Sequence, residues 1–403
     1  MQKKLIALAV ASVASGAAFA QTNVTMYGIA DAGYVYSSGS AMSGVRGNNE
    51  FSGIQSGLLS GSRLGFRGEE ALGNGLKAVF TLEYSLNIDN NSGVGSTGGL
   101  NARQQFVGLA GGFGQIALGR QYSPGYVATV NNDPAGGAAF EPQSYMTAQA
   151  GNTITPNSGA RWDNALTYTS PNWGGFTGKA IYSFGENSSC TVANPAPPPG
   201  TITTTTLNDT CVSTTDNSRW GLGANFASGA FNVDAVYQVR QQVRPAGVLS
   251  NSALWGDDIA EWYVGGSFDL KFVKLMASYQ DQNDKNRINN DNSTWSLGAV
   301  VPLGNAAIHL AWAQTDFDQG LVDGKTNGAM IAGTYAFSKR TTAYAGYVWN
   351  KNDNDSLGLG PVGGGGAPGE TNNTFLAGGC PSFFAPQNTS LLCTRALRRP
   401  FFF

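Results

Sequence analysis

The sequence is short of charged residues, and this shortage narrows the classes of protein it can encode. Only 12% of its 403 residues are charged, and the formal net charge is -2. A soluble globular protein usually carries about a quarter charged residues. The deficit favours a protein whose outer surface does not face water, and the balanced charge gives no reason to expect a nucleic-acid partner.

Histidine is almost absent. His309 is the only one in the chain, so a Ser-His hydrolase site or a multi-histidine metal site would rest on a single residue. The glycine-rich stretch around residues 358–369 lacks the Lys-Ser/Thr pair of a phosphate-binding loop. We therefore expect no enzyme activity, no metal and no cofactor.

Long hydrophobic runs are also missing. No window reaches the ~18 consecutive apolar residues of a membrane-spanning helix. The chain is instead rich in glycine, with 55 residues, and in Tyr and Phe, with 15 and 21. If this protein lies in a bilayer, it must do so as a closed barrel, because only helices and edge-free barrels satisfy every backbone group in hydrocarbon.

The first twenty residues have the pattern of an export signal. Lys3 and Lys4 precede an apolar stretch from Leu5 to Val13, and Ala18-Phe19-Ala20 forms a small-x-small cleavage site. We interpret residues 1–20 as a signal peptide, with a short buried helix as the alternative. A cleaved signal would place the mature chain outside the cytoplasm.

Cysteines are few, and none has the spacing of a zinc site. Cys190 and Cys211 bracket a loop rich in proline and threonine. Outside the cytoplasm a disulfide there would restrain an exposed excursion, and two free thiols are the alternative.

What the chain does contain is alternation. In GLKAVFTLEYSLNI, apolar residues at even positions oppose Lys77, Thr81 and Glu83, and a period of two indicates a strand. In NAAIHLAWAQ the same pattern turns His309 toward the opposite face from Leu310, as a polar lining residue. Segments of this kind lie at roughly 23–36, 60–70, 75–88, 101–111, 114–123, 161–170, 175–185, 217–228, 229–240, 258–270, 271–281, 293–302, 305–317, 326–338, 341–353 and 372–384.

The connections between these sixteen segments alternate between long and short. Loops after odd-numbered strands are long, whereas those after even-numbered strands are tight turns such as ALGNG and PLG. An outer-membrane β-barrel has this asymmetry, with brief periplasmic turns and longer external loops. Tyr and Trp near strand ends, including Tyr36, Trp173 and Trp262, are typical of interfacial girdles. The alternative, a soluble β-sandwich, gives no reason for loops to lengthen on one side only.

Several longer stretches resemble a known family. VTMYGIADAGY, SRLGFRGEEALGNGLKAVFTLEY, RQQFVGLAGGFGQIALGRQYSP and RWDNALTYTSPNWGGFTGKAIY are similar to the Gram-negative general diffusion porins, in particular their β-proteobacterial branch. The resemblance implies an outer-membrane location and a sixteen-stranded antiparallel barrel over residues 21–384. It also implies a water-filled bore, homotrimeric assembly and a third external loop folded into the pore.

The resemblance also implies a site. In the family, arginines on the barrel wall form a basic cluster at the constriction, and the matching positions are Arg63, Arg103, Arg120 and Arg161. The inward-folded loop matches residues 124–160, where Asp133 and Glu141 are candidates for the acidic wall, together with Glu83 on a strand. The first strand has Ile29 where some relatives carry a pore-facing basic residue, and Asp31 lies one inward position further on.

The first strand, NVTMYGIADAGYVY, has an unusually small outward face. Packing against another subunit rather than lipid would favour small outward residues such as Gly28 and Ala30. We therefore expect this strand to lie at a contact between subunits.

The C-terminus departs from the family. Such porins usually end in an alternating strand that finishes on Phe, but here the pattern fails after Gly378, and Pro381 would remove a donor from the sheet. We treat residues 385–403 as an atypical tail and hypothesise a shift of reading frame near residue 379. Closure of the last strand on the first is left in doubt by this pattern.

These features predict a porin for passive diffusion of small hydrophilic solutes and ions. The alternatives are a channel specific for a sugar or another small solute, and, more distantly, a barrel enzyme or adhesin. A specific channel would show an aromatic ladder along its pore.

Overall fold

The computed structural model describes residues 23–39, 50–90, 101–185, 217–243, 257–286, 289–319, 323–361 and 366–383. The expected signal peptide, Cys190, Cys211 and the tail 385–403 lie outside these residues.

Most of the described chain is in strands. Their bounds are β1 (Asn23–Ile29), β2 (Ala32–Gly39), β3 (Phe51–Ser56), β4 (Arg63–Gly73), β5 (Leu76–Ser85), β6 (Ala102–Gly111), β7 (Gly114–Tyr122), β8 (Arg161–Thr169), β9 (Phe176–Ser183), β10 (Arg219–Ser228), β11 (Phe231–Arg240), β12 (Ile259–Asp269), β13 (Lys274–Asp284), β14 (Asp291–Leu303), β15 (Ala306–Asp318), β16 (Lys325–Ala336), β17 (Thr341–Asn352) and β18 (Thr371–Phe383). The helices are α2 (Pro124–Asn131), α3 (Pro142–Gln149) and the 3₁₀ turn η1 (Ser158–Ala160). No helix in the described part of the chain is long and apolar enough to cross a membrane.

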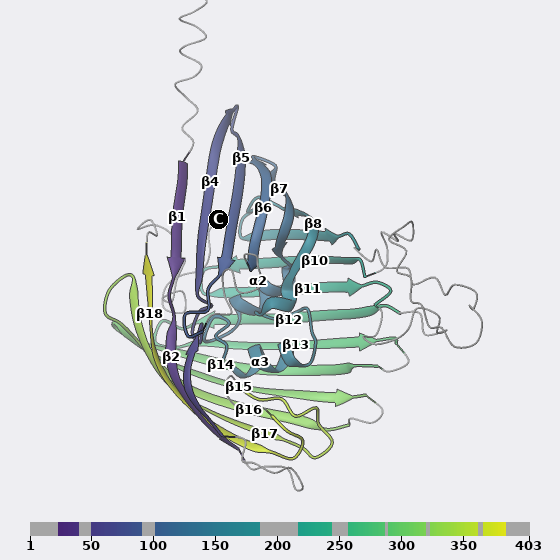
Figure 1. The fold of residues 1–403 in the computed structure, drawn as a ribbon. Coiled ribbons are helices and arrows are strands. Elements are labelled where there is room, and N and C mark those ends of the chain that lie inside the picture. Colours follow the sequence, from purple (N-terminus) through teal and green to yellow (C-terminus); the bar gives the residue numbers. More distant parts are fainter. Residues whose placement is uncertain are drawn as a thin grey trace, which may run out of the picture.

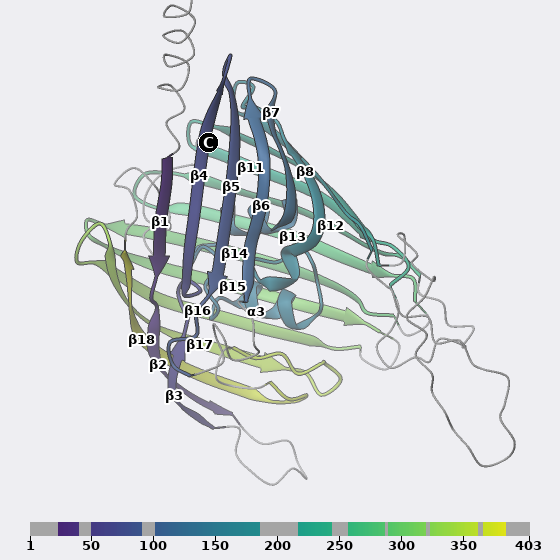
Figure 2. The same ribbon diagram turned by 45° about the horizontal axis from the view of Figure 1, so that its top comes forward.

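The strands form one antiparallel sheet that closes on itself (Figures 1 and 2). β1 and β2 continue one another across Ala30 and Asp31, and β3 and β4 do so across residues 57–62. β2 pairs with β3 and β18, while β1 pairs with β4 and with the end of β18. Counted with each broken strand as one, the eighteen elements make the sixteen strands of a barrel.

The two faces of the sheet differ in polarity, as the alternation predicts. In β11, Phe231 and Tyr237 are exposed on the outside, whereas Asp234 and Gln238 are buried on the inside. Exposed apolar side chains recur around the whole outer face, among them Val24, Leu109, Leu118, Leu222, Leu297, Ile331 and Phe375. A sheet with a continuous apolar exterior and a polar interior is suited to hydrocarbon outside and water inside.

Aromatic rings pack together near the strand ends. At the ends that lead into the longer loops, Trp262 and Trp295 contact Tyr279, with ring centroids 5.1 and 4.3 Å apart. At the tight-turn ends, Trp173 stacks on Phe176. The two bands correspond to the interfacial girdles expected from the sequence.

The first two strands are less regular than the sequence suggests. The expected strand 23–36 is interrupted at Ala30 and Asp31 and runs on to Gly39. Residues 51–56, expected to be loop, form β3. Residues 57–62 separate β3 from β4, and this turn bonds to Arg63, one of the residues predicted for the site.

The expected last strand, 372–384, is present, and the doubt about whether it closes on the first strand is resolved. β18 continues to Phe383, where Cys380 and Ser382 are buried and Pro381 lies between them on the exposed side. Although Pro381 has no N–H, its carbonyl accepts from the Ala30 N–H at 3.0 Å. Gly28 and Ile29 then pair with Phe383 and Ser382, which closes the barrel.

Candidate functional site

Residues 123–160, here called the inner segment, connect β7 to β8 and contain both α-helices. The Ser123 side chain caps α2 by accepting from the Tyr126 N–H, and Pro124 occupies the first turn, where a missing N–H costs nothing. The Glu141 side chain caps α3 in the same way by accepting from the Ser144 N–H. Figure 1 shows both helices on the inner face of the sheet.

Polar side chains of β11 and β12 hold one flank of the inner segment. The Glu261 carboxylate accepts from the Thr153 N–H and hydroxyl and from the Ile154 N–H, at 2.8–3.0 Å. Gln238 accepts from the Gly125 N–H at 2.8 Å, and the Tyr263 hydroxyl donates to the Ala128 carbonyl. Because these partners are buried, losing one would leave an unsatisfied polar group and cost about 1–3 kcal/mol.

The other flank is held from β15 to β17. His309 Nδ1 lies 2.7 Å from the Pro134 carbonyl oxygen, and the Tyr145 hydroxyl donates to Asn350 at 2.9 Å. His309 points inward as the alternation predicts, but it is buried and anchors the inner segment, so its expected role as a lining residue is wrong.

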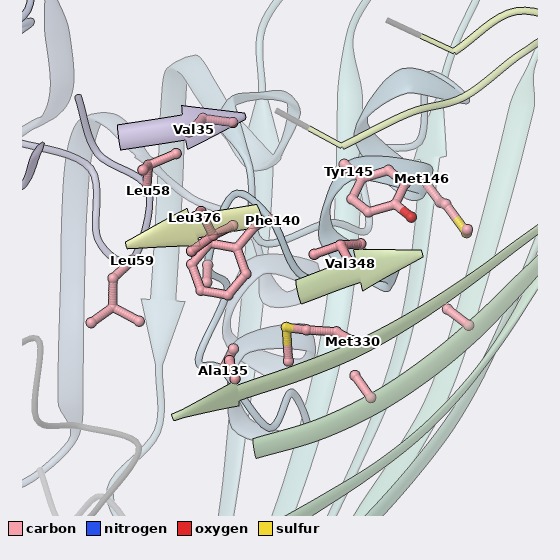
Figure 3. Close-up of a cluster of buried hydrophobic side chains, with 14 of the residues drawn as sticks. Val35, Leu58, Leu59, Ala135, Phe140, Tyr145, Met146, Met330, Val348 and Leu376 are labelled. Carbon is pink, nitrogen blue, oxygen red and sulfur yellow. The ribbon is translucent and has the colours of Figure 1, made fainter. Parts of the chain in front are cut away.

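An apolar cluster completes this attachment. Phe140, Tyr145 and Met146 of the inner segment pack against wall residues that include Leu58, Met330, Val348 and Leu376 (Figure 3). Full burial of a side chain of this size stabilises by about 1.5–3 kcal/mol. The inner segment is therefore fixed to one side of the barrel by polar bonds and by packing.

Arginines gather on β4 and β6 around one carboxylate. Arg103 Nε donates to Glu83 Oε1 at 2.7 Å, and Arg63 Nη1 lies 4.0 Å from Glu83 Oε2. The Tyr27 hydroxyl also donates to Glu83, at 3.0 Å. Two cations surround one anion here, which leaves a net positive charge.

Arg161 joins this group through two stacked tyrosines. The rings of Tyr122 and Tyr126 lie 3.6 Å apart and nearly parallel, and the Arg161 guanidinium sits 5.2 Å from the Tyr122 ring centroid. Arg103 Nη2 donates to the Tyr122 hydroxyl at 3.2 Å. A guanidinium over an aromatic face is held in place while it keeps its charge.

Arg120, also predicted for this site, is arranged differently. The pairing of β7 with β8 shifts between Gly119 and Gln121, and Gly119 has a φ of +132°, a conformation that favours glycine. Arg120 Nη1 donates to Asp163 at 2.7 Å, beside the group rather than within it. Its charge is paired with an exposed carboxylate.

The two acidic residues predicted for the opposite wall are buried rather than facing a pore. Asp133 accepts from the Ala135 N–H at 2.6 Å, and Glu141 accepts from the Ser144 N–H at 2.8 Å. Their remaining oxygens, Asp133 Oδ2 and Glu141 Oε1, have no other donor among the described residues. Burial raises the pKa of Asp133 to about 6, and burial together with the charge of Asp133 raises the pKa of Glu141 well above its usual value. Both carboxyl groups are therefore protonated more readily than exposed carboxyl groups are.

Other charged residues of the inner wall were not among those predicted for the site, although Asp31 was predicted to point inward. Arg219 and Arg240 lie opposite each other on β10 and β11, and Arg240 pairs with Glu261 at 2.9 Å. Asp31 is fully buried and holds the turn between β3 and β4. Inward position in the alternation was the available signal for all of them, but it does not distinguish an anchor from a lining residue.

The described residues contain no cluster of three or more His, Cys, Asp or Glu placed to hold a metal ion. The geometry provides a polar interior, narrowed by the inner segment, with positive charge gathered on β4, β6 and β8. Partly buried charges of this kind are poorly screened by salt and act on ions that pass near them.

Comparison with known proteins agrees with this architecture. Residues 7–355 match the family model described as Gram-negative porin. The chain is similar to outer membrane porin protein 32 of Delftia acidovorans, with 31% identity over 89% of this chain and 92% of that one. It is also similar to an outer membrane porin protein of Bordetella pertussis, with 29% identity over 87% of this chain and 95% of that one.

Among solved structures, the anion-selective porin from Comamonas acidovorans superimposes with a TM-score of 0.71 and 25% identity, covering 90% of this chain and 100% of that one. The family match covers well over half of the chain, and the closed sixteen-stranded barrel is the fold that such a channel needs. The chain therefore belongs to the Gram-negative porins, and it is an outer-membrane porin that forms a water-filled channel for passive diffusion of small hydrophilic solutes and ions.

Proposed function

We propose that Arg63, Arg103 and Arg161 form the basic wall of the channel's constriction, that the inner segment forms the opposite side, and that the channel has a weak preference for small anions. The observation that supports this proposal is the grouping of the three arginines: Arg63 and Arg103 lie around the Glu83 carboxylate, and Arg161 stacks on Tyr122, which accepts from Arg103. The name of the solved Comamonas porin, which is anion-selective, supports the sign of the preference.

The physical basis is an imbalance of charge. Glu83 neutralises one of the three guanidinium groups, while Asp133 and Glu141 are buried within the inner segment, where burial favours their protonated forms. A unit charge about 6 Å from the ion path changes the energy of a passing ion by roughly 1 kcal/mol, or about fivefold in permeability ratio. Polar solutes that fit the gap pass, and large or apolar ones meet a steric and desolvation barrier.

We also propose a homotrimer as the working unit. This assembly is implied by the family resemblance, and the small outward side chain of Ala30, directly after β1, is consistent with a contact between subunits. Cross-linking of the purified protein in mild detergent tests it, because trimers and lower species separate by mass.

The test of the constriction is the zero-current potential of the purified protein in a planar bilayer under a salt gradient. Arg63→Ala and Arg161→Ala should each shift the potential toward cation preference. Lys77→Ala is the matched control, since Lys77 is half-exposed at a tight turn and pairs only with Glu69. Potentials that stay at the wild-type value in both arginine variants would remove these residues from the constriction.

A channel specific for a sugar is the second candidate, and the stacked Tyr122 and Tyr126 rings are the observation that favours it. Sugars bind to aromatic faces, so a specific site would slow or block conductance when its sugar is added. Permeation rates of sugars of graded size separate the two candidates. A smooth fall with size supports general diffusion, and one sugar passing much faster than its size predicts supports a specific channel.

A further inference from the structure

Asp31 lies in the break between β1 and β2, and its side chain is fully buried inside the barrel. Its Oδ2 atom accepts from two consecutive backbone N–H groups, those of Leu59 at 2.7 Å and Ser60 at 2.6 Å. Its Oδ1 atom accepts from the Tyr344 hydroxyl of β17 at 2.6 Å. One carboxylate therefore ties β1 and β2, the 57–62 turn and the far strand β17 together.

The Asp31 backbone holds the same turn. The Asp31 carbonyl accepts from the Gly57 N–H at 2.8 Å and from the Ser62 hydroxyl at 3.0 Å. The Asp31 N–H donates to the Ser62 hydroxyl oxygen at 2.9 Å. At this position the turn bonds to Asp31 instead of pairing with a neighbouring strand. The conformation of the turn therefore depends on Asp31.

The 57–62 turn also positions Arg63. Arg63 Nε donates to the Gly61 carbonyl at 2.8 Å, and Arg63 Nη2 donates to the Ser60 hydroxyl at 2.7 Å. Ser60 therefore connects the two residues directly, because its N–H is bound by Asp31 while its hydroxyl binds the guanidinium. Arg63 itself is placed 4.0 Å from Glu83 by this arrangement.

The same turn meets the inner segment. The Ala139 N–H donates to the Leu58 carbonyl at 2.8 Å. The Phe140 ring lies 6.1 Å, centroid to centroid, from the ring of Tyr344, the residue that donates to Asp31. Figure 3 shows Leu58 and Phe140 in the same buried cluster. Both sides of the proposed constriction are therefore anchored at one carboxylate.

We propose that Asp31 is a positioning residue for ion selection, which fixes Arg63 at its place opposite the inner segment through the 57–62 turn. The proposal rests on the constriction described under Proposed function. Asp31 does not contact the permeating ion, because its side chain has no exposed surface.

The proposal predicts the direction in which the ion preference changes, and this direction is opposite to the one that a simple charge effect predicts. If Asp31 acted only as one negative charge near the pore, removing it would increase anion preference. If Asp31 holds Arg63 in place, removing it lets the turn relax and the guanidinium leave, so anion preference falls. Asp31→Ala should shift the zero-current potential toward cations, in the same direction as Arg63→Ala and by a comparable amount.

A double-mutant cycle in planar bilayers tests whether Asp31 acts through Arg63. Asp31→Ala, Arg63→Ala and the double variant are compared with the wild type, and the double variant should show no cation-directed shift beyond that of Arg63→Ala. Ser37→Ala is the matched control, because Ser37 is buried on the neighbouring strand β2 and bonds to Asn372 and Thr374, away from the turn. Its potential should match the wild type.

Each outcome decides the proposal. An anion-directed shift in Asp31→Ala, no shift, or a cation-directed shift that adds fully to that of Arg63→Ala would overturn it. If Asp31→Ala does not assemble, Tyr344→Phe removes one donor to the carboxylate, and it should shift the potential in the same direction by less; no shift there overturns the proposal. If the proposed constriction itself is wrong, Arg63→Ala will leave the zero-current potential unchanged. This result differs from every outcome that concerns Asp31 alone.

Discussion

Arg103 and Glu83 form a buried ion pair, with Nε donating to Oε1 at 2.7 Å, on the wall that faces the inner segment. Both side chains are almost fully buried, and Arg63 and Tyr27 contact the same carboxylate. The pair thus determines how much of the arginine charge is available to a passing ion. It also contributes to the fit of β4, β5 and β6 at this level.

Glu83→Gln should increase anion preference and lower stability. The substitution removes the only anion that the arginines share, while breaking a buried pair from one side typically costs about 3–5 kcal/mol. We expect a zero-current potential further toward anions, with unfolding at a lower temperature in detergent.

The control for this prediction is Glu69→Gln. Glu69 pairs with Lys77 at 3.1 Å, but both side chains are about half exposed, so the pair is worth little. Neither selectivity nor thermal stability should change. A Glu83→Gln channel with wild-type selectivity would contradict the proposed role of the pair.

Much of the barrel could be predicted from the sequence, because period-two alternation is a local signal. All sixteen expected strands are present, with ends that differ by a few residues. The break at Asp31 and the short strand β3 could not be predicted, because they depend on contacts with Leu59, Ser60 and Tyr344 that are distant in the sequence.

The candidate site, like the barrel, could be predicted from the sequence only in part. The family resemblance supplied Arg63, Arg103 and Arg161, which the structure brings together around Glu83 and Tyr122. The residues next to Asp133 and Glu141 in the sequence do not indicate that these two carboxyl groups are buried inside the inner segment. Burial of a loop residue depends on the part of the barrel wall that the loop packs against, and the sequence of the loop alone does not specify this contact.

The buried Asp133–Glu141 pair should make the inner segment sensitive to pH. Burial raises the pKa of Asp133 to about 6 and that of Glu141 further from its usual value of about 4.3. Because the folded segment binds protons more tightly than an exposed carboxyl group does, its stabilisation is complete below about pH 4. It is lost as the pH rises through about 6, where Asp133 ionises beside Glu141. Burial and the charge of Glu141 raise the pKa of Tyr145, so this hydroxyl stays neutral and adds no third negative charge.

We therefore expect more open-channel noise at pH 8 than at pH 4 in single-channel records. Glu141→Gln should flatten this dependence, because a neutral amide cannot repel Asp133. Asp269→Asn, at an exposed turn beside Lys271, is the control and should keep the wild-type pH profile. A wild-type channel whose noise is constant from pH 4 to 8 would show that the pair does not affect the inner segment.

Phe140 should be the largest apolar contribution to the position of the inner segment. Its ring is 1% exposed and packs in the cluster with Leu58 and Val348. Phe140→Ala leaves a cavity that typically costs about 3–5 kcal/mol, so the segment should move more freely within the bore. We expect larger and noisier single-channel conductance, while Phe272→Ala, at an exposed turn, should leave conductance unchanged.

The small outward residues of β1 separate into two roles, which a pair of variants can distinguish. Gly28 is covered by Phe383 of β18, since a Cβ added at Gly28 would overlap that ring. Gly28→Leu should therefore disturb the seam of the barrel and lower the unfolding temperature of the single chain. Ala30 lies between the inward-facing Ile29 and Asp31 and so faces outward at the proposed subunit contact.

Ala30→Leu should weaken the oligomer without changing the fold of the single chain. A bulkier side chain would separate the packed surfaces, and overpacking of this kind typically costs about 1–3 kcal/mol. The measurement is the fraction of trimer on size-exclusion chromatography in mild detergent as temperature rises, with circular dichroism to follow the barrel. Trimers of Ala30→Leu that persist to the wild-type temperature would place the subunit contact away from this strand, whereas early dissociation into folded single chains would locate it there.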